Sequence, residues 1–135
     1  MNELLNYLKI GALWLWQLPQ IILALLVWAV IGFWSSLGEK FNGKIVIVSK
    51  LVTSGFSLGE FIFLNPRYTK EITLKHEYGH CLQSLMLGPL YLLVIGIPSI
   101  LNFMRSIVKE DSPSYNYYAF YTEKWADKLG GVERS

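Results

Sequence analysis

The longest apolar stretch of the chain lies near its start, where residues 10–34 carry no formally charged side chain. About 20 apolar residues are enough to cross a bilayer as a helix. Pro19 predicts a kink in this helix, and Gln17 and Gln20 are expected to face protein or water. Tryptophans near both ends are typical of membrane interfaces: Trp14, Trp16, Trp28 and Trp34. The pattern predicts an N-terminal transmembrane helix within an anchor region of residues 1–40.

Two other interpretations of this stretch have less support from the residues. A cleaved signal peptide has a shorter apolar core and an A-x-A cleavage site, and neither is found here. A buried helix of a soluble domain would need more protein around it than 135 residues provide. Lys40, Lys44 and Lys50 follow the stretch, whereas only Lys9 precedes it. By the positive-inside rule we expect an integral protein of a bacterial inner or plasma membrane, with the chain after the anchor in the cytoplasm.

Residues 44–64 have the composition of β-strands. The run KIVIVSKLV is rich in β-branched residues, TSG is a turn signal, and SLGEFIFLN is a second apolar run. The segment therefore predicts a short β-hairpin or a small sheet. Gly59 is expected to mark a bulge, and Asn65 with Pro66 is expected to end the second strand and start a helix.

Two helices are expected in the second half, separated by a broken apolar segment. The first covers residues 73–87, because a glycine and a proline follow it directly. The apolar segment covers residues 88–104 and is interrupted by Gly96 and Pro98. The last helix covers residues 113–129, with a serine and a proline at its start and two glycines after it.

The composition agrees with a membrane protein. Hydrophobic residues make up 53% of the chain and charged residues 16%, whereas soluble domains are about a quarter charged. A net charge of +2 without a basic stripe argues against binding to nucleic acid. The single cysteine, Cys81, excludes an internal disulfide. Together with the expected elements, this predicts an α+β membrane protein with a compact region over residues 41–135.

The sequence KHEYGHCLQS contains the only two histidines of the chain. On a helix, His76 and His80 lie one turn apart on one face, so both imidazoles can bind one Zn²⁺ ion. Glu77 reaches the edge of the same site and can take a proton from a zinc-bound water, whose pKa falls to about 7. The short pattern HExxH also arises by chance, so a third ligand is needed to support it.

The third ligand must be acidic or Cys81, because the chain has no other histidine. Cys81 points away from His80 and is expected to pack in the core. Glu123 and Asp127 lie four residues apart, on one face of the last expected helix. Glu123 can complete a site of two histidines and one glutamate, and Asp127 can accept a hydrogen bond from the free ring nitrogen of one of the histidines, with His76 favoured over His80.

The helix that carries Glu123 and Asp127 also has two small residues, Ala119 and Ala126, which allow it to approach the motif helix closely. The alternative is an exposed pair of acidic residues among neighbouring lysines, which is the usual position of helix charges. The histidine motif upstream favours the metal site.

HEYGH followed by EKWAD resembles the gluzincin metallopeptidases, whose pattern is HExxH and then ExxxD. The form ExxAD followed by KLGG is similar to the membrane-embedded HtpX and CAAX prenyl endopeptidase group. The resemblance implies that His76, His80 and Glu123 bind zinc. It also implies that Glu77 is the general base and that Asp127 orients a ligand.

The resemblance covers roughly residues 57–87 and 113–131, and this chain lacks the additional membrane helices of the larger members between the two motifs. It implies a minimal membrane-anchored zinc metalloendopeptidase that acts on peptide or protein substrates near the membrane. A substrate is expected to bind as an added strand along residues 57–64. The alternatives are a non-catalytic metal-binding membrane protein or partner subunit, and a chance motif in a structural membrane protein.

A zinc site also constrains the path of the broken apolar segment. If residues 90–104 crossed the bilayer, Glu123 would emerge on the side opposite His76. As a helix this run is about 22 Å long, shorter than the roughly 30 Å hydrocarbon core. We therefore expect it to re-enter, to lie at the membrane interface, or to pack on the anchor.

Four tyrosines gather near the start of the last expected helix: Tyr115, Tyr117, Tyr118 and Tyr121. They are typical of an interfacial aromatic belt. The other interpretation is that a side chain here stabilises the oxyanion formed on a peptide carbonyl, with Tyr121, Tyr118 and Arg105 as candidates.

Overall fold

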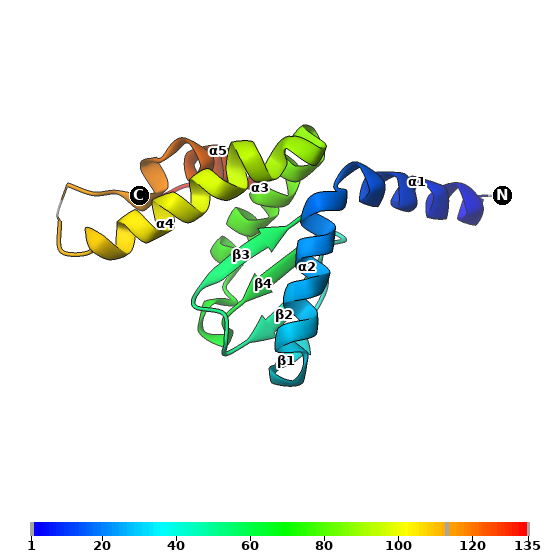
Figure 1. The fold of residues 1–135 in the computed structure, drawn as a ribbon, viewed down its shortest axis with the longest axis horizontal. Coiled ribbons are helices and arrows are strands. Elements are labelled where there is room, and N and C mark those ends of the chain that lie inside the picture. The colour runs from blue at the N-terminus through cyan, green and yellow to red at the C-terminus, as the bar shows by residue number, and fades with distance from the viewer. Residues whose placement is uncertain (1, 113, 135) are drawn as a thin grey trace.

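A four-stranded mixed sheet forms the middle of the molecule (Figure 1). The computed structural model describes residues 2–112 and 114–134. Its helices and strands are α1 (Asn2–Trp16), α2 (Leu18–Ile31), β1 (Ser35–Leu37), β2 (Ile45–Ser49), β3 (Gly55–Leu58), β4 (Phe61–Leu64), α3 (Glu71–Leu87), α4 (Ile97–Val108) and α5 (Tyr121–Gly130). Helix α2 covers one face of the sheet, α3 covers the other, and α5 packs on α3. The predicted α+β class is confirmed.

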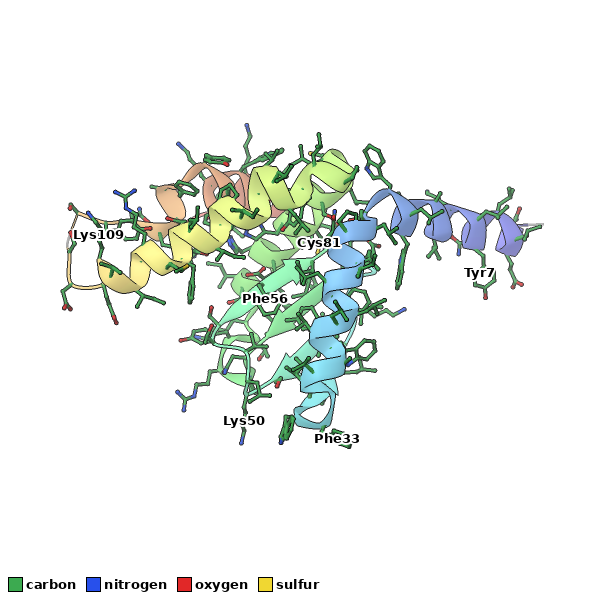
Figure 2. All side chains as sticks on the ribbon, viewed as in Figure 1. Tyr7, Phe33, Lys50, Phe56, Cys81 and Lys109 are labelled. Atoms are coloured by element: carbon green, nitrogen blue, oxygen red, sulfur yellow. The ribbon has the colours of Figure 1, made fainter. Side chains whose placement is uncertain are left out.

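The alternation of side chains along the central strand β4 builds two cores. Phe61 and Phe63 point towards α2, whereas Ile62 and Leu64 point towards α3, because successive strand residues face opposite sides of a sheet. Cys81 lies fully buried in the second core, as expected for a packing residue (Figure 2). Burial raises the pKa of its thiol, so the side chain stays neutral.

The strand order is β1-β2-β4-β3, with β2 and β4 parallel and the other pairs antiparallel. The small sheet was expected, but the second apolar run is itself a hairpin of β3 and β4. Gly59 has a φ of +65°, which favours glycine, and lies in the turn between these strands. It is therefore a turn residue and not a bulge. Asn65 ends β4, and its side chain caps a single 3-10 turn over Pro66–Tyr68.

The apolar stretch over residues 10–34 is not one helix. Helices α1 and α2 meet at a break that bends the chain by 90°. Pro19 lies in the first turn of α2, where backbone N–H groups have no partner within the helix, so a proline costs no helical hydrogen bond. Gln17 and Gln20 are fully buried and reach Ser84 of α3. The Ser84 hydroxyl donates to Oε1 of Gln17 at 2.5 Å, and Nε2 of Gln20 donates to Ser84 Oγ at 2.7 Å, so side-chain hydrogen bonds fix the bend.

One face of α2 is buried against the sheet, although a chain of this length was expected to be too short to bury such a helix. Ile21 and Ala24 are buried against the sheet. Trp14 and Trp28 pack on Phe61, with ring centroids 5.6 and 6.0 Å apart, so these two tryptophans are core residues. Among the described residues, no single helix is both long and apolar enough to cross a membrane; only the bent α1–α2 pair meets the criterion of length and composition.

Helices α3 and α5 approach each other so closely that small residues are required at their contact. A Cβ atom on Gly79 would lie 1.9 Å from the carbonyl oxygen of Ala126, and one on Gly130 would lie 1.9 Å from that of Lys75. Ala126 is fully buried at this contact, as expected, whereas Ala119 is exposed in the turn before α5. The close approach brings the first turns of α5 to the middle of α3.

The chain between α3 and α5 differs in detail from the expected elements. Most of residues 88–104 are helical. A 3-10 turn (Gly88–Leu90) is followed by a π-helical turn (Leu92–Gly96) and then by α4, which has Pro98 in its first turn. Helix α5 begins at Tyr121, later than expected; Pro113, its expected first residue, lies outside the described residues. The segment before α5 is instead tied to α4, because Asn102 Nδ2 donates to the carbonyl oxygen of Tyr117 at 3.1 Å.

Candidate metal centre

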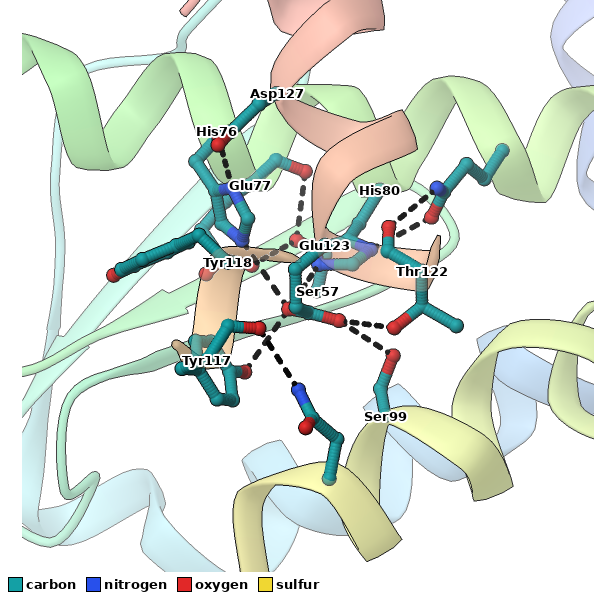
Figure 3. Close-up of polar contacts among 12 residues, drawn as sticks. Ser57, His76, Glu77, His80, Ser99, Tyr117, Tyr118, Thr122, Glu123 and Asp127 are labelled. Atoms are coloured by element: carbon teal, nitrogen blue, oxygen red, sulfur yellow. Dashed lines mark hydrogen bonds and ion pairs between the residues drawn. The ribbon is translucent and has the colours of Figure 1, made fainter. Parts of the chain in front are cut away.

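Two histidines from α3 and one glutamate from α5 converge on one point (Figure 3). The Nε2 atoms of His76 and His80 lie 3.4 and 3.1 Å from Oε1 of Glu123. The three candidate ligand atoms lie within 4.8 Å of one another, and all three side chains are buried. This cluster could hold a metal ion, and it consists of the three ligands expected from the sequence.

Asp127 and Tyr118 orient the ring of His76. Nδ1 of His76 lies 2.6 Å from Oδ1 of Asp127 and donates its proton there, which leaves the lone pair of Nε2 facing Glu123. The ring of Tyr118 packs perpendicular to the imidazole, with centroids 5.4 Å apart. The structure thus brings Asp127 to the histidine for which it was expected.

Gln83 has the corresponding role at His80. Its Nε2 donates to the carbonyl oxygen of Thr122 at 2.9 Å, so its Oε1 must face the histidine. Oε1 accepts the Nδ1 proton of His80 at 2.7 Å. The hydrogen bond selects the tautomer in which Nε2 of His80 carries a lone pair towards Glu123.

Hydroxyl groups fix the carboxylate of Glu123. Tyr117 donates to Oε1 at 2.9 Å, Ser99 donates to Oε2 at 2.9 Å, and Thr122 also donates to Oε2. Burial and the negative charge of Glu123 raise the pKa of Tyr117 far above its ordinary value, so this hydroxyl keeps its proton and acts as a donor. Oε1 is therefore directed towards the two histidines.

The donor set fits a cation. With both Nδ1 atoms donating outwards, two Nε2 lone pairs and Oε1 of Glu123 face one another. Without a cation, a proton takes the place between them: burial lowers the pKa of His76, but the hydrogen bond to Glu123 and the charge of Glu77 raise it to about 9. The pKa of His80 rises for the same reasons. Burial disfavours the carboxylate of Glu123, but its hydrogen bonds to both histidines lower its pKa below the ordinary value.

Glu77 lines a cleft beside this cluster. The cleft has a volume of about 340 Å³, and its walls include His76, Tyr117, Tyr118 and the guanidinium-bearing Arg134. The carboxylate of Glu77 is held from the edge strand β3, where Oγ of Ser57 lies 2.7 Å from Oε2 and donates to it. Glu77, Tyr117 and one of the candidate ligands, His76, therefore border one cleft.

Two of the three candidates for oxyanion stabilisation, Tyr121 and Arg105, do not line this cleft. The hydroxyl of Tyr121 donates to the carbonyl oxygen of Val94 at 2.7 Å. Arg105 lies over the ring of Tyr115, at 5.8 Å from its centroid. Tyr118 does line the cleft, where its ring contacts His76.

Several residues around the cluster were not found from the sequence: Ser57, Gln83, Ser99, Thr122 and Arg134. Gln83 could have been found, because a residue three positions after a ligating histidine lies near it on a helix. The others reach the site from different elements, and no local pattern identifies them.

The geometry of the cluster and its two motifs are the whole support for assigning this site. No family model, no curated protein and no solved structure matches the chain.

Proposed function

We propose that the chain is a zinc metallopeptidase that hydrolyses peptide bonds with Glu77 as general base. The observation that carries the proposal is the convergence of His76, His80 and Glu123 beside a cleft that Glu77 lines. Two imidazole nitrogens and one carboxylate oxygen, with a fourth position left open, are a usual donor set of catalytic zinc. The same activity is implied by the resemblance to the gluzincins.

The bound ion and the residues of the cleft would have different roles in hydrolysis. When bound, zinc supplies Lewis acidity, which polarises a carbonyl group and lowers the pKa of water to about 7. Glu77 takes a proton from the water whose oxygen attacks the carbonyl carbon, and gives a proton to the amide nitrogen as the C–N bond breaks. Ser57 donates to Oε2 of Glu77, whereas Oε1 has no hydrogen-bond donor among the described residues and is free to accept that proton.

Tyr117 is the side chain that we assign to oxyanion stabilisation. Its hydroxyl lies 2.9 Å from Oε1 of Glu123, and the residue lines the cleft. The protonated phenol has one proton to donate, and turning its O–H from Glu123 to the carbonyl oxygen stabilises the negative charge that develops there.

Strand β3 is the element on which a peptide substrate would bind. It is an edge strand of the sheet and carries Ser57, which contacts the general base. Unpaired N–H and C=O groups of an edge strand can pair with an extended peptide, which then adds as a further strand. We therefore assign substrate binding to β3 (Gly55–Leu58) and not to the whole expected segment 57–64, because β4 already has a partner strand on each side.

Chelation and restoration of zinc test the activity. The purified protein is incubated with a fluorescence-quenched peptide library, with and without 1,10-phenanthroline. We expect cleavage that the chelator abolishes and that added zinc restores, because the proposed reaction requires the ion. A chain that binds zinc but cleaves none of the peptides would favour the alternative, a non-catalytic metal-binding protein or partner subunit.

We further propose that the protein binds a membrane through the exposed apolar side chains of α1 and of the segment that ends in α4. Helix α1 has no buried residue, and side chains project from it on all sides (Figure 2). The segment ending in α4 exposes an apolar stripe at helical spacing that includes Leu93, Ile97, Leu101 and Val108. Arg105 and Lys109 near its end can contact anionic headgroups, as in interfacial amphipathic helices. Of the three expected paths for residues 88–104, this favours the membrane interface.

Flotation with vesicles of phosphatidylcholine and phosphatidylglycerol tests the membrane proposal. Burying a leucine side chain in the bilayer contributes roughly 2 kcal/mol to the free energy of binding. Replacing Leu101 by glutamate removes this contribution, so the affinity for vesicles is expected to fall about tenfold or more. Leu51→Glu is the matched control, because Leu51 is exposed to a similar extent, 57% against 60%, but lies outside the stripe. Equal losses of binding for the two variants would contradict a role for the stripe.

A further inference from the structure

The candidate ligand His76 and three other side chains form a closed ring of contacts, and one of the three, Arg134, does not contact the histidine. Asp127 accepts the Nδ1 proton of His76 at 2.6 Å, and Tyr118 packs on the other side of the imidazole. Arg134 contacts both of these partners: its Nε and Nη2 donate to Oδ2 and Oδ1 of Asp127 at 2.7 and 3.1 Å. Its guanidinium carbon lies 3.4 Å above the ring of Tyr118.

The chain after α5 is folded to bring Arg134 to this position. Gly131 ends the helix with a φ of +75°, a left-handed conformation that glycine adopts without strain. The N–H of Val132 then donates to the carbonyl oxygen of Asp127 at 2.8 Å, which turns the chain back along the helix. The side chain of Arg134 therefore reaches the carboxylate seven residues earlier, at the wall of the cleft.

Arginine suits this position for reasons of geometry and not only of charge. Its planar guanidinium can bind two carboxylate oxygens at once while stacking on an aromatic ring, and a lysine ammonium can do neither in the same way. Asp127 would otherwise be free to rotate about its Cβ–Cγ bond, and the hydrogen bond to His76 would loosen. The described structure gives Asp127 no other side-chain donor than His76 and Arg134.

We propose that Arg134 is a positioning residue of the metal centre, which fixes Asp127 and Tyr118 and through them directs Nε2 of His76 at the bound ion. The inference rests on the metal-binding part of the proposed function and not on peptide hydrolysis. It makes the segment after the last helix part of the metal centre, although that segment contributes no ligand.

The test measures metal binding by Arg134→Gln and Arg134→Lys in the full chain, by zinc competition with a chromophoric chelator and by the visible spectrum of the cobalt(II) protein. Outer partners of metal ligands contribute about 10–100-fold to affinity, so Arg134→Gln is expected to weaken zinc binding about tenfold and to change the cobalt(II) bands. Arg134→Lys keeps the positive charge but cannot bind both oxygens of Asp127 through a planar guanidinium. We expect it to restore less than half of the zinc-binding free energy that Arg134→Gln loses. Lys128→Gln, which removes an exposed positive charge from α5, should bind as the parent does.

The outcomes separate this inference from the proposed function. A folded Arg134→Gln variant with unchanged zinc affinity and an unchanged cobalt(II) spectrum would overturn the positioning role while leaving the metal site intact. Full rescue by Arg134→Lys would also overturn it, because charge alone would then suffice. A parent chain that binds neither metal would remove the proposed function and this inference together. If Arg134→Gln does not fold, Arg134→Lys and Tyr118→Leu supply the comparison, since each disrupts a different contact of the ring.

Discussion

Replacing His80 by alanine is expected to leave the purified protein without zinc, where the parent chain should hold about one ion. His80 supplies one of three convergent donor atoms, and the remaining two cannot enclose a cation in the same way. Loss of an outer partner already weakens zinc sites about 10–100-fold, so loss of a ligand should cost more than about 100-fold in affinity. Elemental analysis of the purified protein and competition titration with a chelator measure the effect.

His76→Ala should give the same loss, because the two imidazoles occupy equivalent positions around Glu123. Lys75→Ala is the matched control on the same helix, since the Lys75 side chain is 41% exposed and its ion-pair partner among the described residues is the exposed Glu71. Circular dichroism must show that each variant is folded, because the loss of His80 removes one buried hydrogen bond from Gln83 and one from Glu123. If both folded histidine variants retained a full equivalent of zinc, the cluster would not be the binding site.

The geometry of the candidate ligands was the part of the site that the sequence could predict. His76 and His80 lie on one face of α3 because helical periodicity alone places residues four apart together. Glu123 and Asp127 share a face of α5 for the same reason. That the two faces meet depends on glycine at 79 and 130, where any larger residue would hold the helices apart.

The residues that hold these ligands could not be predicted, because their contacts join distant parts of the chain. Ser57 reaches Glu77 from a strand, and Tyr117 reaches Glu123 from a turn that depends on Asn102 of α4. The side chain of Arg134 is brought to Asp127 only by the turn at Gly131. Such contacts are set by tertiary packing, which leaves no periodic pattern in the sequence.

The fold around the N-terminus also depends on contacts that the sequence pattern does not reveal. An apolar helix gives no indication of which face is covered, so residues 10–34 were expected to form a single membrane helix. The buried hydrogen bonds of Gln17 and Gln20 with Ser84 instead fix two helices at a right angle. The polar residues that looked like defects in a membrane span therefore attach α2 to the helix that carries the histidines.

Replacing Glu77 by glutamine is expected to reduce peptide hydrolysis by about 10²–10⁴-fold, the usual contribution of a general base. Zinc content should stay at the parent level, because Glu77 is not one of the three convergent ligands. Glutamine has the size of glutamate and can still accept the hydrogen bond of Ser57, so the helix and the cleft should be preserved. The amide cannot remove a proton from water, and this is the only function that the change should eliminate.

Initial rates with a cleaved peptide from the library, together with zinc content, measure the effect of Glu77→Gln. The matched control is Glu71→Gln, which neutralises an acidic side chain of the same helix that is 75% exposed and lies outside the cleft. Its rate should match that of the parent. If Glu77→Gln retained the parent rate with zinc bound, another group would have to accept the proton, and the assignment of the general base would be wrong. If the variant lost its zinc as well, Glu77 would contribute to zinc binding, and its assignment as a base that is not a ligand would be wrong.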